Sequence, residues 1–377
     1  MAVLVLRTSA FRNLADGEIT TKAKDVFLVG GNGQGKTNFL EALYFCSYGS
    51  SFRGVKDREL ARGGEGDFSA SAESVDHETV LPLPVRIAVK VEKSRKTITL
   101  DGKKIEDRKD LLKIIPCVAF CHEDMEFVSG TQEKRRWFFD QTQSLYDLVY
   151  LEDLRRYRRV LKNRNTVLRD SKMGGNYREA AEMLDVLDPQ LAEYGLRLME
   201  KRRLAAEQFS AVFGPLYQEV SGIAGIGVSY VPSWKAAGRD AVLRRLTEHR
   251  AADLAQGITL SGLHRDRYMF VRNTRNEASA GSRKDFAETA STGQRRLLAL
   301  LLRVAQARCF SENSGKTPVL LLDDVLLELD GEKRQRFLSV MPAYEQAFFT
   351  FLPEEPYKRY CRSDTLVYHV SNGVISG

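Results

Sequence analysis

The 377-residue sequence has few cysteines and no long apolar run. Its five cysteines form no Cys-x-x-Cys pair, which argues against a disulfide framework or a cysteine zinc site and indicates a reducing compartment. No stretch of about 18 uncharged apolar residues occurs, so the sequence predicts no membrane span. The opening MAVLVLRTSAF lacks the long apolar core of a signal peptide and is more typical of a first strand. A cytoplasmic protein without a membrane partner is therefore expected.

Basic residues, in contrast, are in excess. Lysine and arginine number 57 against 50 acidic residues, which gives a net charge of +7 and a pI near 9.0. Such an excess favours an anionic partner, with nucleic acid as the first candidate. The chain is longer than one average domain, and its composition, 43% hydrophobic and 28% charged, is that of a globular protein.

A glycine-rich stretch at residues 30 to 38, GGNGQGKTN, matches Gly-x-x-x-x-Gly-Lys-Thr. Glycines let the backbone curl around a phosphate with its N–H groups pointing inward. Lys36 is expected to reach the β- and γ-phosphates, and the Thr37 hydroxyl to bind Mg²⁺. The predicted nucleotide-binding residues are Gly30, Gly31, Asn32, Gly33, Gln34, Gly35, Lys36 and Thr37.

The flanks of this stretch support the match. Before it, residues 26 to 29 form the apolar run VFLV, which is typical of a buried strand. After it, Leu40, Leu43 and Tyr44 fall at helical spacing. Strand, loop and helix in this order point a helix N-terminus at an anion, so the loop is predicted to bind a nucleoside triphosphate.

A second apolar strand, in PVLLLDDVLLELD, ends at Asp323 and Asp324. A carboxylate at the end of a buried parallel strand beside a phosphate loop is a common Mg²⁺ ligand. Asp323 is the metal candidate together with Thr37, and Asp324 is the candidate to orient or deprotonate the attacking water. An Asp-Asp pair by itself is common, so this assignment depends on the apolar run before it.

A third motif, ASTGQRR, precedes a helix that has leucines along one face. By itself it is typical of an N-capped helix. In the order phosphate loop, Ser-x-Gly-Gln helix and acidic strand end, the sequence resembles the ATPases of the ABC class. The resemblance implies that Ser291, Gly293 and Gln294 face the nucleotide of a partner subunit, so that they join Lys36 and Asp324 as catalytic residues.

The chain between these motifs is long and largely helical. Residues 150 to 168 and 184 to 198 carry apolar residues at three-four spacing, interrupted at Arg164, and KMGGNY between them predicts a reversal. Asp188-Pro189 could begin a helix or kink one. The pattern predicts either a short antiparallel helical arm or a plain helical subdomain. Residues 222 to 240 are predicted to be rich in loops.

The fold class expected is α/β: an ABC-type P-loop ATPase head with an inserted helical, short coiled-coil-like lobe. The inserted arm is what splits the head in the SMC-like branch of the class. Residues 1–125 are expected to form the N-terminal part of the head, 126–256 the helical lobe, and 257–377 the C-terminal part. In the first part, RIAVKVEK and KTITLDGKKI alternate as half-buried antiparallel strands do, and Asp16-Gly17 and Asp101-Gly102 predict turns.

Several segments are similar to the bacterial RecF family in the same order along the chain. They are GGNGQGKTNFLEALYFCSYGSSFR, the helical segment from EDMEFVSG to LKNRN, GLHRDR at 262 to 267, ASTGQRR and LLLDDVLLELD. The sequence departs from the family at Leu263, where proline is usual, and at Arg267, where a second acid is usual. Thr292 and His122 replace the more frequent Gln and Pro. These departures leave the role of residues 262 to 267 open.

The resemblance implies an ATP-switched DNA clamp for replication and recombinational repair. ATP would drive homodimerisation, the dimer would hold duplex DNA near single-strand gaps, and slow, DNA-stimulated hydrolysis would release it. A RecR-like mediator is the implied protein partner, and RecA loading the implied outcome. Asp324 stands where the wider ABC class more often has Glu, which hints at slow turnover.

The residues themselves offer one DNA-binding candidate, the run RRYRRVLKNR. Six basic groups lie in ten residues without an acid: Arg155, Arg156, Arg158, Arg159, Lys162 and Arg164. A solvated helical face is an equally good interpretation, since charge runs usually form one. No base-reading motif occurs, so backbone or shape recognition of DNA is expected.

Other P-loop proteins fit the sequence less well. A chromosome-organising SMC protein needs longer coiled coils than an arm of about 40 residues per side. An ABC transporter ATPase lacks so long an insert and commonly has a switch histidine where Thr350 stands. A GTPase needs an Asn-Lys-x-Asp motif, which is missing. A small-molecule kinase leaves the Ser291 helix unexplained.

Overall fold

The computed structural model describes residues 2–75, 83–235, 238–272, 285–329 and 331–377. The chain divides into two compact units, one of Met1–Asp124 with Ala299–Gly377 and the other of Met125–Leu298. This division differs from the three segments expected from the sequence, because residues 257 to 298 group with the helical unit. The physical reason is a strand in this stretch that pairs with one in the helical region, as described below.

The first unit is built on a six-stranded sheet of order β14-β13-β3-β12-β11-β8, in which only β14 is antiparallel to its neighbour. These strands are β14 (Val374–Ser376), β13 (Thr365–Ser371), β3 (Asp25–Val29), β12 (Gln346–Phe351), β11 (Val319–Leu322) and β8 (Cys117–Phe120). The central strands are buried along their whole length and largely apolar, as strands covered on both faces are. The parallel strands place the ends of β3, β12 and β11 at one edge.

A second, antiparallel sheet has the order β2-β1-β4-β5-β6-β7. Its strands are β2 (Gly17–Thr20), β1 (Ala2–Ser9), β4 (Phe68–Val75), β5 (Val85–Glu92), β6 (Arg95–Leu100) and β7 (Lys103–Lys104). The alternation in residues 86 to 105 predicted this pairing correctly. Asp101 and Gly102 form the β6–β7 turn with φ values of 47° and 78°, because a two-residue hairpin loop of this type needs positive φ at both positions.

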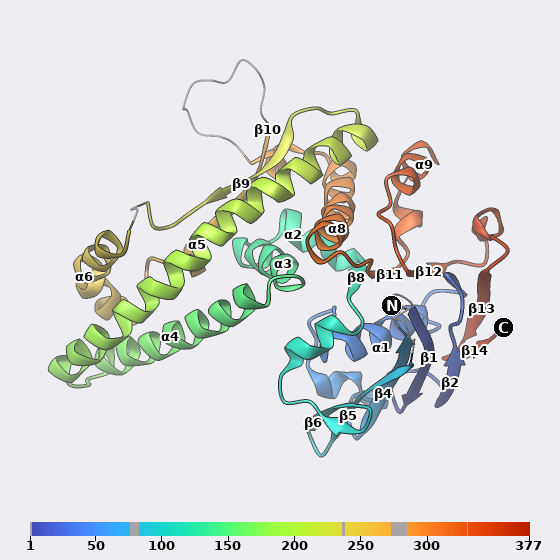
Figure 1. Ribbon diagram of the computed structural model, residues 1–377, viewed down its shortest axis with the longest axis horizontal. Coiled ribbons are helices and arrows are strands. Elements are labelled where there is room, and N and C mark those ends of the chain that lie inside the picture. The colour runs from blue at the N-terminus through green and yellow to red at the C-terminus, as the bar shows by residue number, and fades with distance from the viewer. Residues whose placement is uncertain (1, 76–82, 236–237, 273–284, 330) are drawn as a thin grey trace. The chain divides into compact units, whose positions relative to one another are not determined.

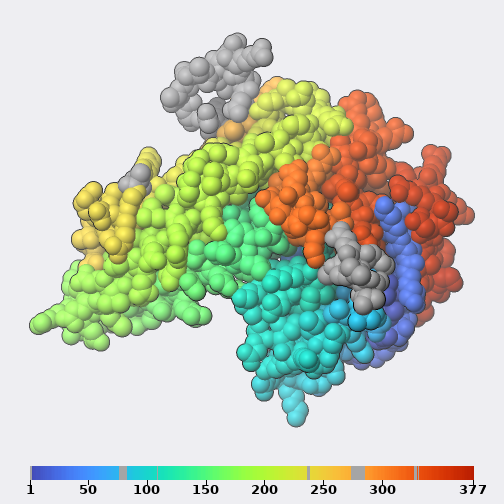
Figure 2. Space-filling view, viewed as in Figure 1, coloured from blue at the N-terminus to red at the C-terminus, as the bar shows by residue number. Residues whose placement is uncertain are grey.

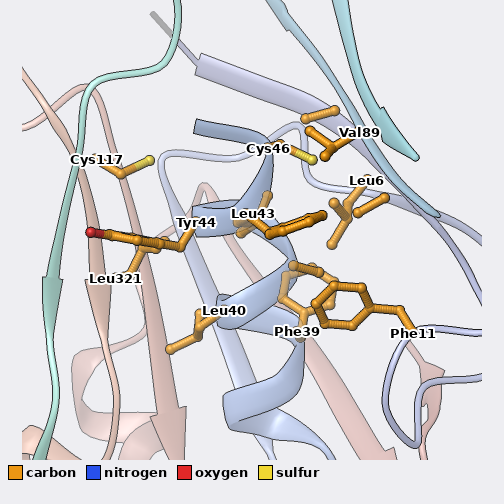
Figure 3. Close-up of a cluster of buried hydrophobic side chains, with 14 of the residues drawn as sticks. Leu6, Phe11, Phe39, Leu40, Leu43, Tyr44, Cys46, Val89, Cys117 and Leu321 are labelled. Carbon is orange, nitrogen blue, oxygen red and sulfur yellow. The ribbon is translucent and has the colours of Figure 1, made fainter. Parts of the chain in front are cut away.

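Helix α1 (Lys36–Tyr48) packs between the two sheets, against β4 and β5 on one side and β8 and β12 on the other. Figure 3 shows Phe39, Leu40 and Leu43 projecting from this helix into the cluster of buried side chains around it. Helix α9 (Gly331–Ser339) also belongs to this unit. Because α1 is buried on both sides, its N-terminus is fixed at the edge where β3 ends.

The second unit is mainly helical. Its helices are α2 (Met125–Ser129), α3 (Gln132–Ser144), α4 (Leu148–Lys172), α5 (Tyr177–Ser221), α6 (Arg239–Gln256) and α7 (Phe286–Thr289), and α8 (Thr292–Ser314) runs from this unit into the first. Helices α4 and α5 run side by side (Figure 1). The predicted reversal at KMGGNY is confirmed, with Asn176 capping α5. In Figure 2 the green surface of this hairpin projects beyond α6.

Two details of this unit bear on the sequence-based expectations. Of the two alternatives for Pro189, a helix start is wrong, because Pro189 lies inside α5, which is continuous over 45 residues. The stretch expected to be loop-rich contains β9 (Ile226–Val231), which pairs antiparallel with β10 (Arg267–Arg272). The flanking glycines obscured a short strand whose partner lies about 40 residues later in the sequence. In the described part of the chain, no helix has the length and apolarity needed to cross a membrane.

Candidate nucleotide-binding site

The glycine-rich stretch connects the end of β3 to the start of α1. Gly33 and Gly35 have φ values of 74° and 117°, which side chains rarely adopt. A Cβ on Gly30 would lie 2.4 Å from the Val370 carbonyl oxygen, and one on Gly35 would lie 2.9 Å from Asn13 Oδ1. Conformation and close packing both therefore require glycine, as the motif predicted.

Hydrogen bonds from the β13–β14 turn hold this loop in place. The Gly373 N–H donates to the Gln34 carbonyl oxygen at 2.8 Å, and the Asn372 N–H donates to Gln34 Oε1 at 2.6 Å. From the N-terminal region, Asn13 Nδ2 donates to the Gly33 carbonyl at 3.3 Å. The Gln34 carbonyl oxygen and Oε1 are thus engaged by the chain itself, which leaves the backbone N–H and the Nε2 group of Gln34 for a ligand.

Lys36 is buried within the loop, with 4% of its surface exposed. Its ammonium group donates to the carbonyl oxygens of Gly30 at 2.7 Å and Gly31 at 3.1 Å. Among the described residues it forms no salt bridge, although its charge lowers the pKa of nearby Glu355. A buried cation held mainly by carbonyl oxygens favours an anionic ligand such as phosphate.

Thr37 and Asp323 meet, although 286 residues separate them in the sequence. Thr37 Oγ1 donates to Asp323 Oδ1 at 2.9 Å. Thr350, at the end of β12 between the two motif strands, reaches both carboxylates, with its Oγ1 3.2 Å from Asp323 Oδ1 and 2.9 Å from Asp324 Oδ1. The same oxygen accepts the Asp324 N–H at 2.7 Å. Asp324 has a φ of 51°, so this residue is held in the left-handed region.

The two carboxylates carry negative charge that no salt bridge within the described chain compensates. Burial and the charge of Asp324 raise the pKa of Asp323 to about 6, although hydrogen bonds from Thr37 and Thr350 and the charge of Arg53 act in the opposite direction. Carboxylate and hydroxyl oxygens are the ligands that Mg²⁺ prefers. The oxygen-only donor set and its uncompensated charge therefore fit a magnesium ion.

Sequence reasoning missed several groups around this site. Arg53 donates to Asn38 Oδ1 at 3.1 Å, and it also pairs with the buried carboxylate of Glu41 at 3.4 Å. The pKa of Glu355 is raised, chiefly by burial and also by Asp324, while Lys36 lowers it. Glu355 follows no motif in the sequence, and Thr350 was singled out only as the residue that stands where transporter ATPases have a switch histidine. Strand order alone brings β12 and the residues after it near the acids.

The Ser-x-Gly-Gln segment forms the start of α8 in the other unit. The Ser291 N–H donates to Gln294 Oε1 at 2.8 Å, and the Gln294 N–H donates to Ser291 Oγ at 3.3 Å, a reciprocal capping box. Ser291, Thr292 and Gly293 are exposed. A Cβ on Gly293 would have no described atom within 4 Å, and its φ is not in the positive range. Neither packing nor backbone conformation therefore explains this glycine.

The basic run lies on α4, and five of its six members are exposed. They are Arg155, Arg156, Arg158, Arg159 and Lys162. Arg164 is wrong as a DNA contact, because it is 0% exposed and forms salt bridges with Asp188 at 2.8 Å and Asp253 at 2.7 Å. Arg164 interrupts the three-four spacing of apolar residues along α4, yet two acids from neighbouring helices balance its charge there.

Comparison with known proteins shows the family of this chain. Residues 3–376 match the family model described as the RecF/RecN/SMC N terminal domain. A DNA replication and repair protein RecF from Treponema pallidum (strain Nichols) is 40% identical over 367 residues, covering 96% of this chain and 97% of the relative. Another from Lachnospira eligens is 32% identical, covering 90% of this chain and 89% of the relative.

Solved structures show the same likeness. A structure of the recombination mediator protein RecF with ATP in the RecFOR pathway has a TM-score of 0.85 and 27% identity over 99% of this chain and 96% of its own. An Smc head bound to the C-winged helix domain of ScpA, with a TM-score of 0.53 and 14% identity over 99% of this chain and 96% of that one, shares the fold.

The fold and the joined motifs define an SMC-like, ABC-type ATPase head with a helical insertion. Within that class, the chain belongs to the RecF family.

Proposed function

We propose that this protein binds and hydrolyses ATP and uses the nucleotide to control its hold on DNA during replication and recombinational repair. The observation that carries the proposal is the 2.9 Å contact between Thr37 and Asp323, which joins the phosphate loop to the acidic strand end. The names of the RecF relatives and the ATP-bound RecF structure support the same function. Because the family is that of ATPases, turnover rather than binding alone is expected.

In this proposal each side chain has a separate task. Lys36 exchanges its two carbonyl acceptors for phosphate oxygens, and the loop N–H groups of residues 31 to 37 surround the phosphates. Thr37 and Asp323 hold Mg²⁺, which neutralises phosphate charge when bound. Asp324 orients the attacking water and accepts its proton.

A second copy of the chain would complete the site through Ser291, Gly293 and Gln294. The exposed Gly293 supports this arrangement, because glycine is used where another molecule approaches the backbone closely. The capping box fixes the first turn of α8, so the Ser291 hydroxyl and the free N–H groups are ready to meet a phosphate. ATP held by two subunits favours the closed dimer over separate monomers.

DNA is the proposed macromolecular ligand, contacted along its backbone by exposed basic residues of α4. These are Arg155, Arg156, Arg158, Arg159 and Lys162, without Arg164. Duplex DNA near single-strand gaps is the expected substrate, hydrolysis is expected to be weak and DNA-stimulated, and a RecR-like mediator is expected to join in RecA loading. The RecFOR pathway named for two similar structures supports the mediator.

Sedimentation of the purified protein with and without ATP tests the two-subunit site. ATP should convert monomer to dimer, and Lys36→Ala and Ser291→Arg should each abolish the shift. Ser291→Asp adds a sharper control, because aspartate caps a helix as well as serine does but places negative charge opposite a phosphate. A Ser291→Asp protein that dimerises normally with ATP, or a wild type that binds ATP yet stays monomeric with DNA present, would contradict the composite site.

Turnover is expected to be slow, since Asp324 is shorter than the glutamate more usual in the wider ABC class. A steady-state rate near the ~10 per second typical of enzymes would contradict this expectation.

A further inference from the structure

The segment GLHRDR at 262 to 267 places two arginines on the surface on either side of a buried aspartate. Arg265 and Arg267 are exposed, whereas Asp266 is 1% exposed. Within the described part of the chain, neither arginine has a salt bridge or a side-chain hydrogen bond. Two neighbouring guanidinium groups are therefore exposed without a described counter-ion.

The loop that carries these arginines is held rigidly. Asp266 accepts hydrogen bonds from the Ser233 N–H at 2.8 Å and the Tyr230 hydroxyl at 2.5 Å, and it pairs with Arg202 at 2.8 Å. A Cβ on Gly262 would lie 2.7 Å from the Tyr157 hydroxyl, so the backbone is pressed against α4. Side chains on a fixed backbone lose less entropy on binding, which favours a binding role.

Further arginines extend this surface toward the basic run of α4. Arg136 on α3 donates to the Asp266 carbonyl oxygen at 2.7 Å. One helical turn later, Asp140 accepts from Arg158 at 3.2 Å, and Arg158 belongs to the basic run. Buried Arg202 joins Asp140 to Asp266, so ion pairs and hydrogen bonds connect this series without a break. Tyr157, whose hydroxyl lies 3.2 Å from His264 Nδ1, anchors the loop to the same helix.

The net charge of this series is positive, because five arginines face three acids. The arginines are Arg136, Arg158, Arg202, Arg265 and Arg267. The acids are Asp140, Asp266 and Glu133, and the charge of Glu133 also acts on Arg136. His264 adds no charge near neutral pH, because burial, with smaller contributions from nearby arginines, lowers its pKa to about 4. Arg202 pairs with both buried acids, and among the described residues Arg265 and Arg267 have no side-chain partner, so these two guanidinium groups are available to an anion.

We infer that the 262–267 loop is a phosphate-binding element of the DNA surface, with Arg265 and Arg267 contacting the duplex backbone and Arg136 and Arg158 connecting it to α4. The inference rests on the proposed DNA-binding function and extends it to residues for which the sequence offered no role. Duplex DNA is the favoured ligand because a row of separated guanidinium groups matches successive phosphates better than it matches one triphosphate. No base contact is implied, so binding should not depend on DNA sequence.

The test is fluorescence anisotropy of the full-length protein on a labelled 30-base-pair duplex, with ATP, over a series of salt concentrations. Arg265→Gln/Arg267→Gln should bind about tenfold more weakly, and its salt slope should fall by about 2, since each lost phosphate contact removes about 0.9. Arg265→Lys/Arg267→Lys should retain most of the slope. The matched control is Arg58→Gln/Arg95→Gln, which removes from the first unit two exposed arginines that form no salt bridge with any described residue.

Three outcomes separate the possibilities. If the wild type binds no duplex, the proposed DNA function itself fails. If the wild type binds and the loop variant matches the Arg58/Arg95 control in affinity and salt slope, the loop inference is overturned while the DNA function stands. If the loop variant loses affinity for radiolabelled ATP instead of for DNA, the arginines serve the nucleotide, which also overturns it. Unchanged thermal melting is expected, because neither arginine is buried or paired.

Discussion

The buried carboxylates of the helical unit are balanced by arginines, whereas the adjacent carboxylates of the nucleotide site are not. In the helical unit, Arg164 pairs with Asp188 and Asp253, and Arg202 pairs with Asp140 and Asp266. At the nucleotide site, the adjacent acids that end β11 have hydroxyl partners and no salt bridge within the described chain.

The paired acids of the helical unit stabilise the fold, whereas the unpaired acids of the nucleotide site are suited to binding a ligand. The charge of a buried acid beside a buried arginine is neutralised, and removing one partner of the pair should lower the free energy of unfolding. Two adjacent acids held only by hydroxyls retain negative charge that a metal ion can neutralise, at some cost to the stability of the protein without that ion. The predictions that follow test whether this distinction between balanced and unbalanced charge holds.

The largest effect is expected at Arg164. Arg164→Met should lower the free energy of unfolding by about 3–5 kcal/mol, because it leaves Asp253 buried without a counter-ion and Asp188 with Arg250 alone. Urea denaturation followed by circular dichroism measures the change. Arg159→Met, an exposed arginine on the same helix, is the control and should be close to wild type. Equal stability of the two variants would show that the Arg164 cluster is not structural.

Substitution of Asp323 should raise the free energy of unfolding, whereas substitution of Arg164 should lower it. Its pKa is raised from 3.8 to about 6, so the folded protein favours the protonated acid. Below about pH 4 the acid is protonated in both the folded and unfolded states, and above about pH 6 the folded state bears the full cost of ionising it. Without Mg²⁺, Asp323→Asn should therefore be more stable than wild type at pH 7.5, by about 1–3 kcal/mol.

This stability gain should disappear as the pH falls toward 4. Thermal melting of both proteins across this pH range measures it, with the exposed Asp364→Asn as control. A gain that is constant with pH would mean that the ionisation of Asp323 is not its cause.

Thr350 offers a finer test within the same site. Thr350→Val keeps the shape of the side chain but removes the hydroxyl that contacts both carboxylates and accepts the Asp324 N–H. Hydrogen bonds to charged groups contribute about 1.5–3 kcal/mol, so kcat for ATP should fall roughly 10- to 100-fold.

ATP affinity should change much less, because Thr350 positions Asp324 and has no contact with the phosphate loop in the described chain. Thr350→Ser should restore most of the rate. A loss of ATP affinity with unchanged kcat would contradict the positioning role.

The smallest effect is expected at the α8 capping box. Ser291→Ala removes the acceptor for the Gln294 N–H and should lower stability by about 1 kcal/mol, as cap removal usually does. Ser291→Asp should leave stability unchanged in the same denaturation experiment. Comparing the two variants separates the cap from the proposed contact with a partner's nucleotide, since only the second requires an uncharged hydroxyl.

Much of the nucleotide site could be predicted from local sequence. The spacing of Gly30, Gly35, Lys36 and Thr37 has a direct steric and hydrogen-bonding reason, and the structure shows the glycines required by conformation and packing. The apolar run before Asp323 predicted a buried strand for the same kind of reason. Thr350 and Glu355, by contrast, acquire their positions only from strand order, which no local pattern encodes.

The pattern of charged residues in the sequence was the least reliable predictor of which side chains form the basic surface. The run from Arg155 to Arg164 is continuous in sequence, yet helical periodicity turns Arg164 inward while its neighbours face outward. Arg265 and Arg267 formed no run and were left without a role, although folding places them in one series with Arg136 and Arg158. A basic surface is assembled from several elements, so its members need not be close in sequence.

The sequence by itself determined the phosphate loop, the acidic strand end and the reversal between the long helices, because each depends on short-range sterics and hydrogen bonding. Tertiary structure alone decided which charges are balanced. An ion pair such as that of Arg164 with Asp253 joins residues 89 positions apart, and its existence depends on how helices pack rather than on either residue's neighbours. The same long-range packing decided that Asp323 meets Thr37 without meeting a cation.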